Sequence, residues 1–250
     1  MTGILFIARL GSTRLSNKHL IEVNGKSFVE WLVTRYTFEF KKEIENGKVK
    51  LFLATSNMPE NKKFETVLNN LPITIFYGDD QNIPLRQTEC AEKYMLKNII
   101  SIDGDDILCS TKAARNTYNQ LIENINPFVK TTGLAFGMNV VGYTSDFLKK
   151  KVSQISGKLE TGWGRIFENE PIYEINMGTN SENKDLRLTL DYDLDAEFFK
   201  AVISYCGNSI VALNDDDLIN LILEKQFFKI NKSLHDQYWA NFNKQKNNEL

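Results

Sequence analysis

The chain has 250 residues, of which 42% are hydrophobic, enough to bury the core of one large α/β domain or two small ones. Its 30 lysine and arginine residues and 32 aspartate and glutamate residues give a net charge of -2, whereas a general nucleic-acid binder usually carries a basic excess. No apolar run approaches the roughly 18 residues that span a bilayer, and the N-terminus lacks a secretory signal pattern. We therefore expect a soluble cytoplasmic protein that binds neither nucleic acid nor membrane.

Three cysteines, Cys90, Cys109 and Cys206, are isolated along the chain. An odd number at such spacings matches neither a disulfide framework nor a zinc site. They are predicted to be small buried residues of a protein in a reducing compartment.

Short β-rich runs alternate with helical patterns in the first half of the chain. Strands are predicted from apolar runs at residues 3–9, 49–56, 73–78 and 98–105. Helices are predicted between and after them at residues 28–45, 60–71, 84–96 and 110–125. Pro84 would open the third helix, and Ser110 or Thr111 would cap the fourth. Such alternation predicts an α/β fold in which helices cover both faces of a mainly parallel sheet, with ligands at the carboxyl ends of the strands.

The pattern changes at about residue 128. Residues 128–145 and 171–177 are typical of antiparallel or mixed strands, and a glycine-rich segment at 157–165 separates them. Because no low-complexity linker flanks residues 128–180, we interpret this stretch as an insertion into a single domain of residues 1–250. Residues 186–205 then predict a strand that runs into a helix. The C-terminal tail, residues 208–250, is predicted to be helical and to close over the core.

A basic loop follows the first predicted strand. Its sequence is ARLGSTRLSNKHL, and its basic residues are Arg9, Arg14, Lys18 and His19. The Gly11-Ser12-Thr13 turn can point successive backbone N–H groups into a concavity, and with the nearby cations it suits a polyphosphate. A solvated surface turn is the alternative. The loop is neither a dinucleotide fingerprint nor a P-loop, since both glycine patterns are absent, and the later Asn24-Gly25 pair predicts a tight turn.

Two acidic clusters follow predicted strands. The first contains Asp103, Asp105 and Asp106, and the second contains Asp191, Asp193 and Asp195. Both are expected to open on the same sheet edge as the basic loop. A phosphate-bound Mg²⁺ takes one or two carboxylates together with phosphate oxygens and waters, so Asp105 and Asp191 are candidate metal ligands. Capping of the helices that follow is the alternative, and it is the better interpretation for Asp193 and Asp195.

Taken together, these stretches resemble a known family. ARLGSTRLSNKHLIEVNGKS is similar to the A-R-x-x-S-x-R-L-P-x-K-x-L signature of the cytidylyltransferases that activate acidic sugars. That group includes CMP-Kdo synthetases, CMP-acylneuraminate synthetases and SpsF-type spore-coat polysaccharide proteins. FYGDDQNIPLRQ, IDGDDIL and LRLTLDYDLDAEF resemble further motifs of the family, in the same order, over residues 4–197. Proline is replaced in these motifs at Ser16, Ser27, Ile107 and Asp193, but no charged group is lost.

The resemblance implies a glycosyltransferase-A-like, Rossmann-like three-layer fold, with CTP as nucleotide, Mg²⁺ as cofactor and a homodimeric assembly. The enzyme would transfer CMP to an acidic sugar or a small phosphorylated or phosphonate acceptor, with release of pyrophosphate, for surface polysaccharide synthesis. By position, the nucleotide would be bound by Ala8, Arg9, Gly11, Ser12, Arg14, Lys18, Ser56, Gly78, Asp79, Arg86 and Asp103. The catalytic residues would be Lys18, Arg14, Asp105 and Asp191, the last two holding the metal.

Several points stay open at this stage. Glu160 and Arg165 are candidates for acceptor binding in the insertion, where Arg165 could hold a carboxylate or phosphate, although Trp163 between them could equally anchor a dimer contact. Lys18, as a loop lysine, is expected to affect turnover far more than stability, and His19 is expected to pack or to lie at the surface. Two alternative functions remain. One is an Asp-x-Asp glycosyltransferase, whose diphosphate donor requires less positive charge than a triphosphate does. The other is a non-catalytic nucleotide-binding protein.

Overall fold

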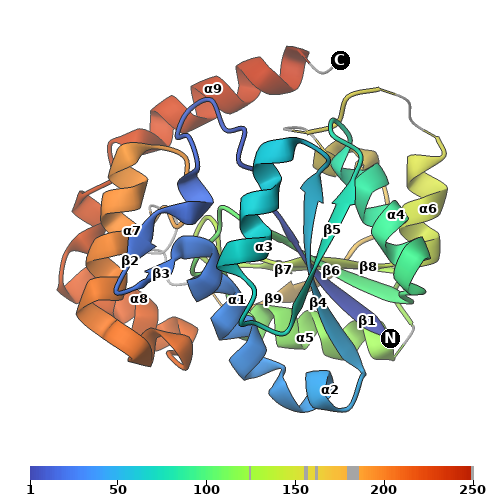
Figure 1. Cartoon of the computed structure of the whole chain (residues 1–250), viewed down its shortest axis with the longest axis horizontal. Helices are drawn as coiled ribbons and strands as arrows, with labels where there is room; N and C mark the ends of the chain where they lie inside the picture. The colour runs from blue at the N-terminus through green and yellow to red at the C-terminus, as the bar shows by residue number, and fades with distance from the viewer. Residues whose placement is uncertain (124, 155–156, 161–162, 179–185, 249–250) are drawn as a thin grey trace.

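The computed structural model describes residues 1–123, 125–154, 157–160, 163–178 and 186–248. Within these residues, a seven-stranded sheet forms the centre of the molecule (Figure 1). Its strands, in chain order, are β1 (Thr2–Ile7), β4 (Val49–Ser56), β5 (Ile73–Gly78), β6 (Asn98–Asp103), β7 (Phe128–Thr132), β8 (Val141–Thr144) and β9 (Tyr173–Asn176). Their order in space is β5-β4-β1-β6-β8-β7-β9.

The sheet is mostly parallel. β5, β4, β1 and β6 run parallel, β8 pairs antiparallel with β6 and β7, and β9 is parallel to β7. The predicted α/β class is therefore confirmed, with mixed strands in its second half. The described strands of the predicted insertion continue the central sheet, whereas residues 155–156, 161–162 and 179–180 of that stretch lie outside the described residues.

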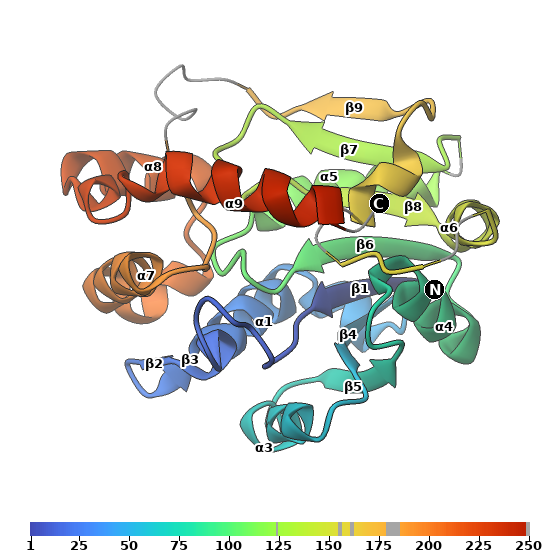
Figure 2. The ribbon, with the colours of Figure 1, turned by 90° about the horizontal axis from the view of Figure 1, so that it is seen from above.

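Alternation along β1 sends neighbouring side chains to opposite faces of the sheet. Ile4 and Phe6 belong to a core cluster with α1 (Phe28–Glu39), α3 (Lys63–Val67) and α5 (Thr111–Ile122). Leu5 and Ile7 belong to a second cluster with α4 (Ile83–Tyr94) and α6 (Ser145–Val152). Helices thus cover both faces (Figure 2), which confirms the three-layer arrangement.

The C-terminal part of the chain packs beside this sandwich. It contains α7 (Asp193–Cys206), α8 (Asp215–Glu224) and α9 (Leu234–Asn248). α7 and α8 form a third core cluster with Phe28 and Trp31 of α1. α9 leaves that group and runs across the side toward which the arrows of β4 and β5 point (Figure 1). The helical tail is confirmed over its described residues, and residues 249–250 lie outside them.

Short elements complete the described chain. They are β2 (Glu22–Val23), β3 (Lys26–Ser27), α2 (Lys41–Glu45) and the 3-10 helices η1 (Lys18–Leu20), η2 (Pro59–Lys62), η3 (Trp163–Phe167), η5 (Gly207–Val211) and η6 (Phe227–Lys229). β2 and β3 form a hairpin whose turn residues, Asn24 and Gly25, have φ of 52° and 76°. The predicted tight turn is thereby confirmed, because two positive φ angles are what a twisted two-residue hairpin requires.

Two helix predictions were too long, and one helix was missed. The predicted helix at 28–45 breaks at Phe40, where φ is -101° and ψ is 17°, and the ring of Phe40 is fully buried against Tyr36 and Tyr118. The helix predicted at 60–71 is reduced to η2 and α3. α6 follows directly on β8, over residues for which no element was predicted beyond residue 145.

The strand predicted at residues 186–190 is wrong. These residues are extended, but they form only an isolated bridge between Arg187 and Phe136. The apolar side chains that produced the prediction, Leu186, Leu188 and Leu190, are buried in the cluster of α7 and α8. Burial against helices gives the same sequence pattern as burial in a sheet, so the pattern did not distinguish the two.

The described helices include none with both the length and the hydropathy needed to span a bilayer. The three cysteines are free thiols, and the prediction that they are buried holds for two of them. Cys90 and Cys109 are buried, and Cys206 is half-buried.

Candidate functional site

A cavity of about 530 Å³ opens where β1 and β6 end. Its lining comes from the basic loop, both acidic clusters, the start of α4, the insertion and α9. The lining residues are Ile7, Ala8, Arg9, Gly11, Ser12, Thr13, Arg14, Lys18, His19, Ile83, Arg86, Asp103, Asp105, Asp106, Phe136, Lys158, Glu160, Trp163, Thr189, Asp191, Tyr238 and Phe242. Most of the predicted site residues therefore meet in one place.

Parallel pairing of β1 and β6 brings the basic loop and the first acidic cluster together. Ile7 stands opposite Asp103 in the register, so both strands end at the same level. Gly104 follows, and its N–H donates to the Ile7 carbonyl at 2.8 Å. A Cβ at Gly104 would lie 2.7 Å from Ala8 Cβ and 2.8 Å from the Ile7 oxygen. Only glycine permits this close approach of the two chain segments.

Asp191 reaches the same place from the extended segment at 186–190. The Leu190 N–H donates to the Asp105 carbonyl oxygen at 2.9 Å, which fixes the segment beside the end of β6. The prediction that the two acidic clusters share one edge is correct, although Asp191 does not follow a strand.

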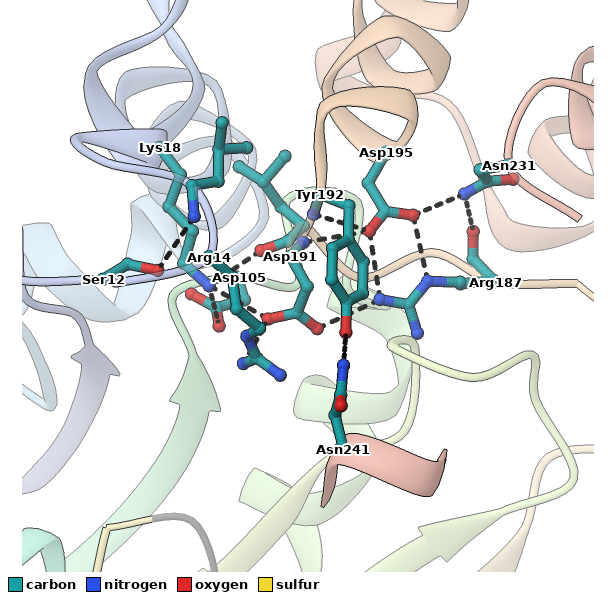
Figure 3. A network of polar contacts seen from close by, with 12 residues as sticks. Ser12, Arg14, Lys18, Asp105, Arg187, Asp191, Tyr192, Asp195, Asn231 and Asn241 are labelled. Carbon is teal, nitrogen blue, oxygen red and sulfur yellow. Dashed lines mark hydrogen bonds and ion pairs between the residues drawn. The ribbon is translucent and has the colours of Figure 1, made fainter. Parts of the chain in front are cut away.

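Lys18 links the two clusters (Figure 3). Its Nζ donates to Asp105 Oδ2 at 2.5 Å, to Asp191 Oδ1 at 3.2 Å and to the Leu190 carbonyl at 2.8 Å. Burial alone would lower the pKa of Lys18, but the charges of Asp105 and Asp191 outweigh it and raise this pKa. The expectation of an exposed loop lysine is wrong, because only 4% of Lys18 is exposed.

Asp191 is surrounded by cations. Its Oδ1 also accepts from Arg14 Nη2 at 2.7 Å, and its Oδ2 accepts from Arg187 Nη2 at 3.0 Å. Burial would raise the pKa of Asp191, but the charges of Lys18, Arg14 and Arg187 together hold it below its usual value. Asp191 is therefore ionised at neutral pH.

A buried network behind Asp191 holds it in place (Figure 3). Arg187 donates from Nε and Nη2 to the two carboxylate oxygens of Asp195, at 2.9 and 3.0 Å. Asp195 Oδ2 also accepts the backbone N–H groups of Asp191 and Tyr192, and Asn231 Nδ2 donates to Asp195 Oδ1 at 2.9 Å. The capping interpretation is thus confirmed for Asp195, which satisfies N–H groups at the start of α7. Asp193 is exposed in the same turn.

Asp103 and His19 are two further titratable groups of the cavity lining. The carboxylate of Asp103 opens on the cavity, where the surrounding protein and then the charge of Asp105 raise its pKa to about 7. His19 is buried, with Nε2 3.3 Å from Asp105 Oδ1 and its ring near Phe64. Burial lowers the pKa of His19 to about 4, so the ring is neutral at pH 7. Of the two roles expected for His19, packing or a surface position, the structure shows packing.

Arg9, Arg86 and Glu160 line one end of the cavity. Arg9 Nη1 donates to Glu160 Oε1 at 2.5 Å, which joins the basic loop to the insertion. Arg86 is almost fully buried, and its Nε donates to the Asp79 carbonyl at 2.7 Å. Glu160, predicted to bind the acceptor, therefore lies beside the arginines predicted to bind the nucleotide.

Four predicted site residues lie outside the cavity lining: Ser56, Gly78, Asp79 and Arg165. Ser56 Oγ accepts a hydrogen bond from Asn61 Nδ2, and Asn61 Oδ1 accepts one from the Leu10 N–H. Ser56 therefore helps to fix the backbone of the basic loop through Asn61. Asp79 caps the turn before α4 by accepting two backbone N–H groups. A Cβ at Gly78 would lie 2.7 Å from the ring of Phe76 and 2.8 Å from Arg86 Cγ, so a larger residue there would displace both side chains.

Sequence reasoning missed several residues of the site. Arg187 lies in the motif LRLTLDYDLDAEF, but no function was predicted for it. The sequence feature that could have indicated its ion pairs is the presence of two carboxylates four and eight residues later. Phe136, Tyr238 and Phe242 form an aromatic part of the lining. The four-residue spacing of Tyr238 and Phe242 on a helix was the available signal for a shared face.

The site contains oxygen donors that suit a hard divalent cation. The carboxylates of Asp105 and Asp191 come from different elements and converge on the Lys18 ammonium. Among the described residues, no group of three or more histidine, cysteine, aspartate or glutamate side chains is arranged to hold a metal by itself. An ion here would therefore need further oxygen ligands, such as those of a phosphate, and would need Lys18 to move from its position between the carboxylates.

Comparisons with known proteins identify the family and the fold. A family model described as cytidylyltransferase matches residues 4–175. An uncharacterised protein of Methanocaldococcus jannaschii is 24% identical over 197 residues, which are 77% of this chain and 79% of that protein.

Solved structures share the fold. A cytidylyltransferase from Leptospira borgpetersenii serovar Hardjo-bovis has a TM-score of 0.78 at 22% identity, covering 91% of this chain and 95% of its own. CMP:2-keto-3-deoxy-manno-octonic acid synthetase complexed with CTP has a TM-score of 0.62 at 14% identity, covering 82% and 98%. Because the family model spans more than half of its residues, this chain belongs to the cytidylyltransferase family.

Proposed function

We propose that the protein is a Mg²⁺-dependent cytidylyltransferase that uses CTP and releases pyrophosphate. The observation that carries this proposal is the meeting of Arg14 and Lys18 with Asp105 and Asp191 in one cavity, in a chain of this family. The solved CMP:2-keto-3-deoxy-manno-octonic acid synthetase with CTP supports the choice of nucleotide.

The charges of the cavity lining support binding of a nucleotide together with a cation. Its cations are Arg9, Arg14, Lys18, Arg86 and Lys158, and its carboxylates are Asp103, Asp105, Asp106, Glu160 and Asp191. Four of these cations are already paired: Arg9 and Lys158 with Glu160, Arg14 with Asp191, and Lys18 with Asp105 and Asp191. A triphosphate that takes these cations leaves carboxylates without partners. Mg²⁺ would restore the balance, so nucleotide and metal should bind cooperatively.

The proposed reaction needs alignment and charge stabilisation more than covalent help from the protein. An acceptor oxygen forms a bond to the α-phosphorus of CTP, while the bond from that phosphorus to the pyrophosphate oxygen breaks. Arg14 and Lys18 would hold the phosphate oxygens and stabilise the leaving pyrophosphate. Asp105 and Asp191 would hold Mg²⁺, which supplies neutralisation of phosphate charge when it is bound. Asp195 and Arg187 position Asp191 for that role.

The acceptor in this proposal is an acidic sugar or a small phosphorylated or phosphonate compound, activated for surface polysaccharide synthesis. An Asp-x-Asp glycosyltransferase is less well supported, because the loop after β1 presents more positive charge than a diphosphate donor requires. A homodimer and a cytoplasmic location complete the proposal.

Thermal melting tests the proposal directly. The protein is melted with CTP, ATP, GTP or UTP, each with and without Mg²⁺. We expect an increase in Tm with CTP and Mg²⁺ only, of roughly 5–11 °C at a ligand concentration of about 100 Kd. Pyrophosphate release is then measured with acidic and phosphorylated acceptors. Stabilisation by UDP- or GDP-sugars alone would support a glycosyltransferase, and CTP binding without turnover would support a non-catalytic protein.

A further inference from the structure

We propose that α9 forms a wall of the acceptor site, where Tyr238 and Phe242 contact a ring of the acceptor. This inference rests on the proposed cytidylyl transfer. It places the acceptor against the C-terminal helix rather than at Glu160 and Arg165, and it makes two aromatic side chains determinants of acceptor specificity.

An aromatic cluster faces the cavity from α9. Tyr238 and Phe242 are one helical turn apart, with ring centroids 5.9 Å apart and planes inclined by 25°. Phe136, from the β7–β8 connection, packs on Tyr238 at 5.1 Å. Trp239 contacts both Phe136 and Phe242 but is not part of the cavity lining. Three rings thus face the cavity while Trp239 packs beside them, which gives a surface of fixed orientation.

α9 is attached next to the reactive centre. Asn241 Nδ2 donates to the Tyr192 hydroxyl at 2.8 Å, and Tyr192 is adjacent to Asp191. The Arg187 guanidinium, which binds Asp191, lies 4.5 Å from the centroid of the Tyr238 ring. Burial and then the charges of Asp191, Asp106 and Asp103 raise the pKa of Tyr238. The Tyr238 ring therefore lies against the guanidinium that binds Asp191, one of the two carboxylates proposed to hold the metal.

The two ends of the cavity differ in chemistry. Arg9 and Arg86 stand at one end with Glu160, and this end suits an anionic nucleotide. At the α9 end two cations are already engaged: Arg187 binds Asp191 and Asp195 and is covered by Tyr238, and Arg14, 5.7 Å from the Tyr192 ring, binds Asp191. That end therefore suits the part of a ligand that presents an apolar face rather than a phosphate.

Such a surface favours an acceptor with a ring. Aromatic side chains contribute large, rigid contact areas, and a sugar ring offers a face of C–H groups that can lie on them. A short open-chain phosphorylated alcohol would leave the three rings facing water. The Tyr238 hydroxyl supplies a polar group that can bind a ring hydroxyl at the edge of this surface.

Product-like conjugates of CMP test the inference without knowledge of the natural acceptor. Isothermal titration calorimetry with Mg²⁺ compares CMP with two cyclic conjugates, CMP-N-acetylneuraminate and CDP-glucose, and with two acyclic ones, CDP-glycerol and CDP-choline. The variants are Phe242→Ala and, as a matched control, Phe227→Ala, another half-buried phenylalanine of the C-terminal tail that does not line the cavity. If Phe242→Ala lowers Tm, Phe242→Leu is used in its place, because leucine keeps most of the apolar volume but has no flat ring.

We expect at least one cyclic conjugate to bind about tenfold more tightly than CMP, because one good aromatic contact contributes an affinity gain of about that size. Phe242→Ala should remove most of this gain and leave the Kd of CMP unchanged, whereas Phe227→Ala should keep both. The inference is overturned if acyclic conjugates gain as much, if no conjugate gains, or if Phe242→Ala weakens CMP equally, since the rings would then hold the base. If the wild type binds neither CMP nor CTP, the proposed function fails first and this inference fails with it.

Discussion

Lys18→Met removes the ammonium that joins the two acidic clusters and keeps most of the apolar stem. In the wild type the Nζ stands 2.5 Å from Asp105 Oδ2 and 3.2 Å from Asp191 Oδ1. Without it, two carboxylates face each other across the space that the ammonium occupied. We expect the variant to lose both stability and turnover, because the same group balances the carboxylates and, in the proposed reaction, holds phosphate.

The size of the stability loss follows from the partners that remain. Breaking a buried ion pair by removal of one member costs about 3–5 kcal/mol when the other member is left without compensation. Asp191 keeps Arg14 and Arg187, and the side chain of Asp105 is 29% exposed to the cavity. We therefore expect a smaller loss of about 2–3 kcal/mol, within the range for charge-assisted hydrogen bonds. For a chain of this length that corresponds to a decrease in Tm of about 4–12 °C.

Calorimetric melting at pH 7.5 measures this change, with Lys41→Met as control. Lys41 is a surface lysine whose side chain is 73% exposed, so its substitution should change stability by less than about 0.5 kcal/mol. Because the folded-state pKa of Lys18 is raised, its contribution is fully present at this pH and is lost only as the pH rises through that pKa. Mg²⁺ alone should stabilise the Lys18→Met variant more than the wild type. Equal melting of the two lysine variants would refute the proposed balance of charges.

Three further predictions follow from individual contacts. Glu160→Gln should tighten CTP binding by up to about fivefold in calorimetric titration, because Arg9 is 44% exposed and its ion pair with Glu160 contributes at most about 1 kcal/mol. Gly137→Ala should destabilise the fold by about 2–4 kcal/mol in urea unfolding, since φ is 90° and the new Cβ would lie 2.1 Å from the Leu188 oxygen. Because the folded-state pKa of Asp191 is lowered, its contribution to stability is present above pH 3.8 and is lost as the pH falls through the folded-state pKa. The unfolding midpoints of the wild type and of Asp191→Asn should therefore converge in acid.

Each of these has an outcome that contradicts it. Weaker CTP binding by Glu160→Gln would show that Glu160 itself contacts the ligand. Gly164→Ala is the control for the glycine substitution, because no atom lies within 4 Å of its Cβ position, and equal effects of the two would remove the steric argument. A difference between wild type and Asp191→Asn that is constant with pH would mean that the Asp191 charge does not contribute.

The sequence alone determined the first four strands of the sheet, their parallel class and the edge on which the site lies. Strands β4 and β5 have the predicted bounds, because an apolar run between turn residues leaves little freedom in where a buried strand begins and ends. Parallel strands end at a common edge, so the basic loop after β1 and the acidic turn after β6 had to lie side by side. That topology places Lys18 and Asp105 at the same edge of the sheet, whereas their direct contact was not predicted.

Tertiary structure alone decided how these groups are used. Two hydrogen bonds hold the extended segment that carries Asp191: the Leu190 N–H donates to the Asp105 carbonyl, and the Asp191 N–H donates to the Asp195 carboxylate. Local periodicity does not encode these contacts. The burial of Lys18 depends on a residue 173 positions away in the sequence. The aromatic face of α9 joins the cavity only because α7 and α8 direct the tail across the sheet edge. A sequence pattern reports which side of an element is buried, whereas packing between distant elements determines what lies against it.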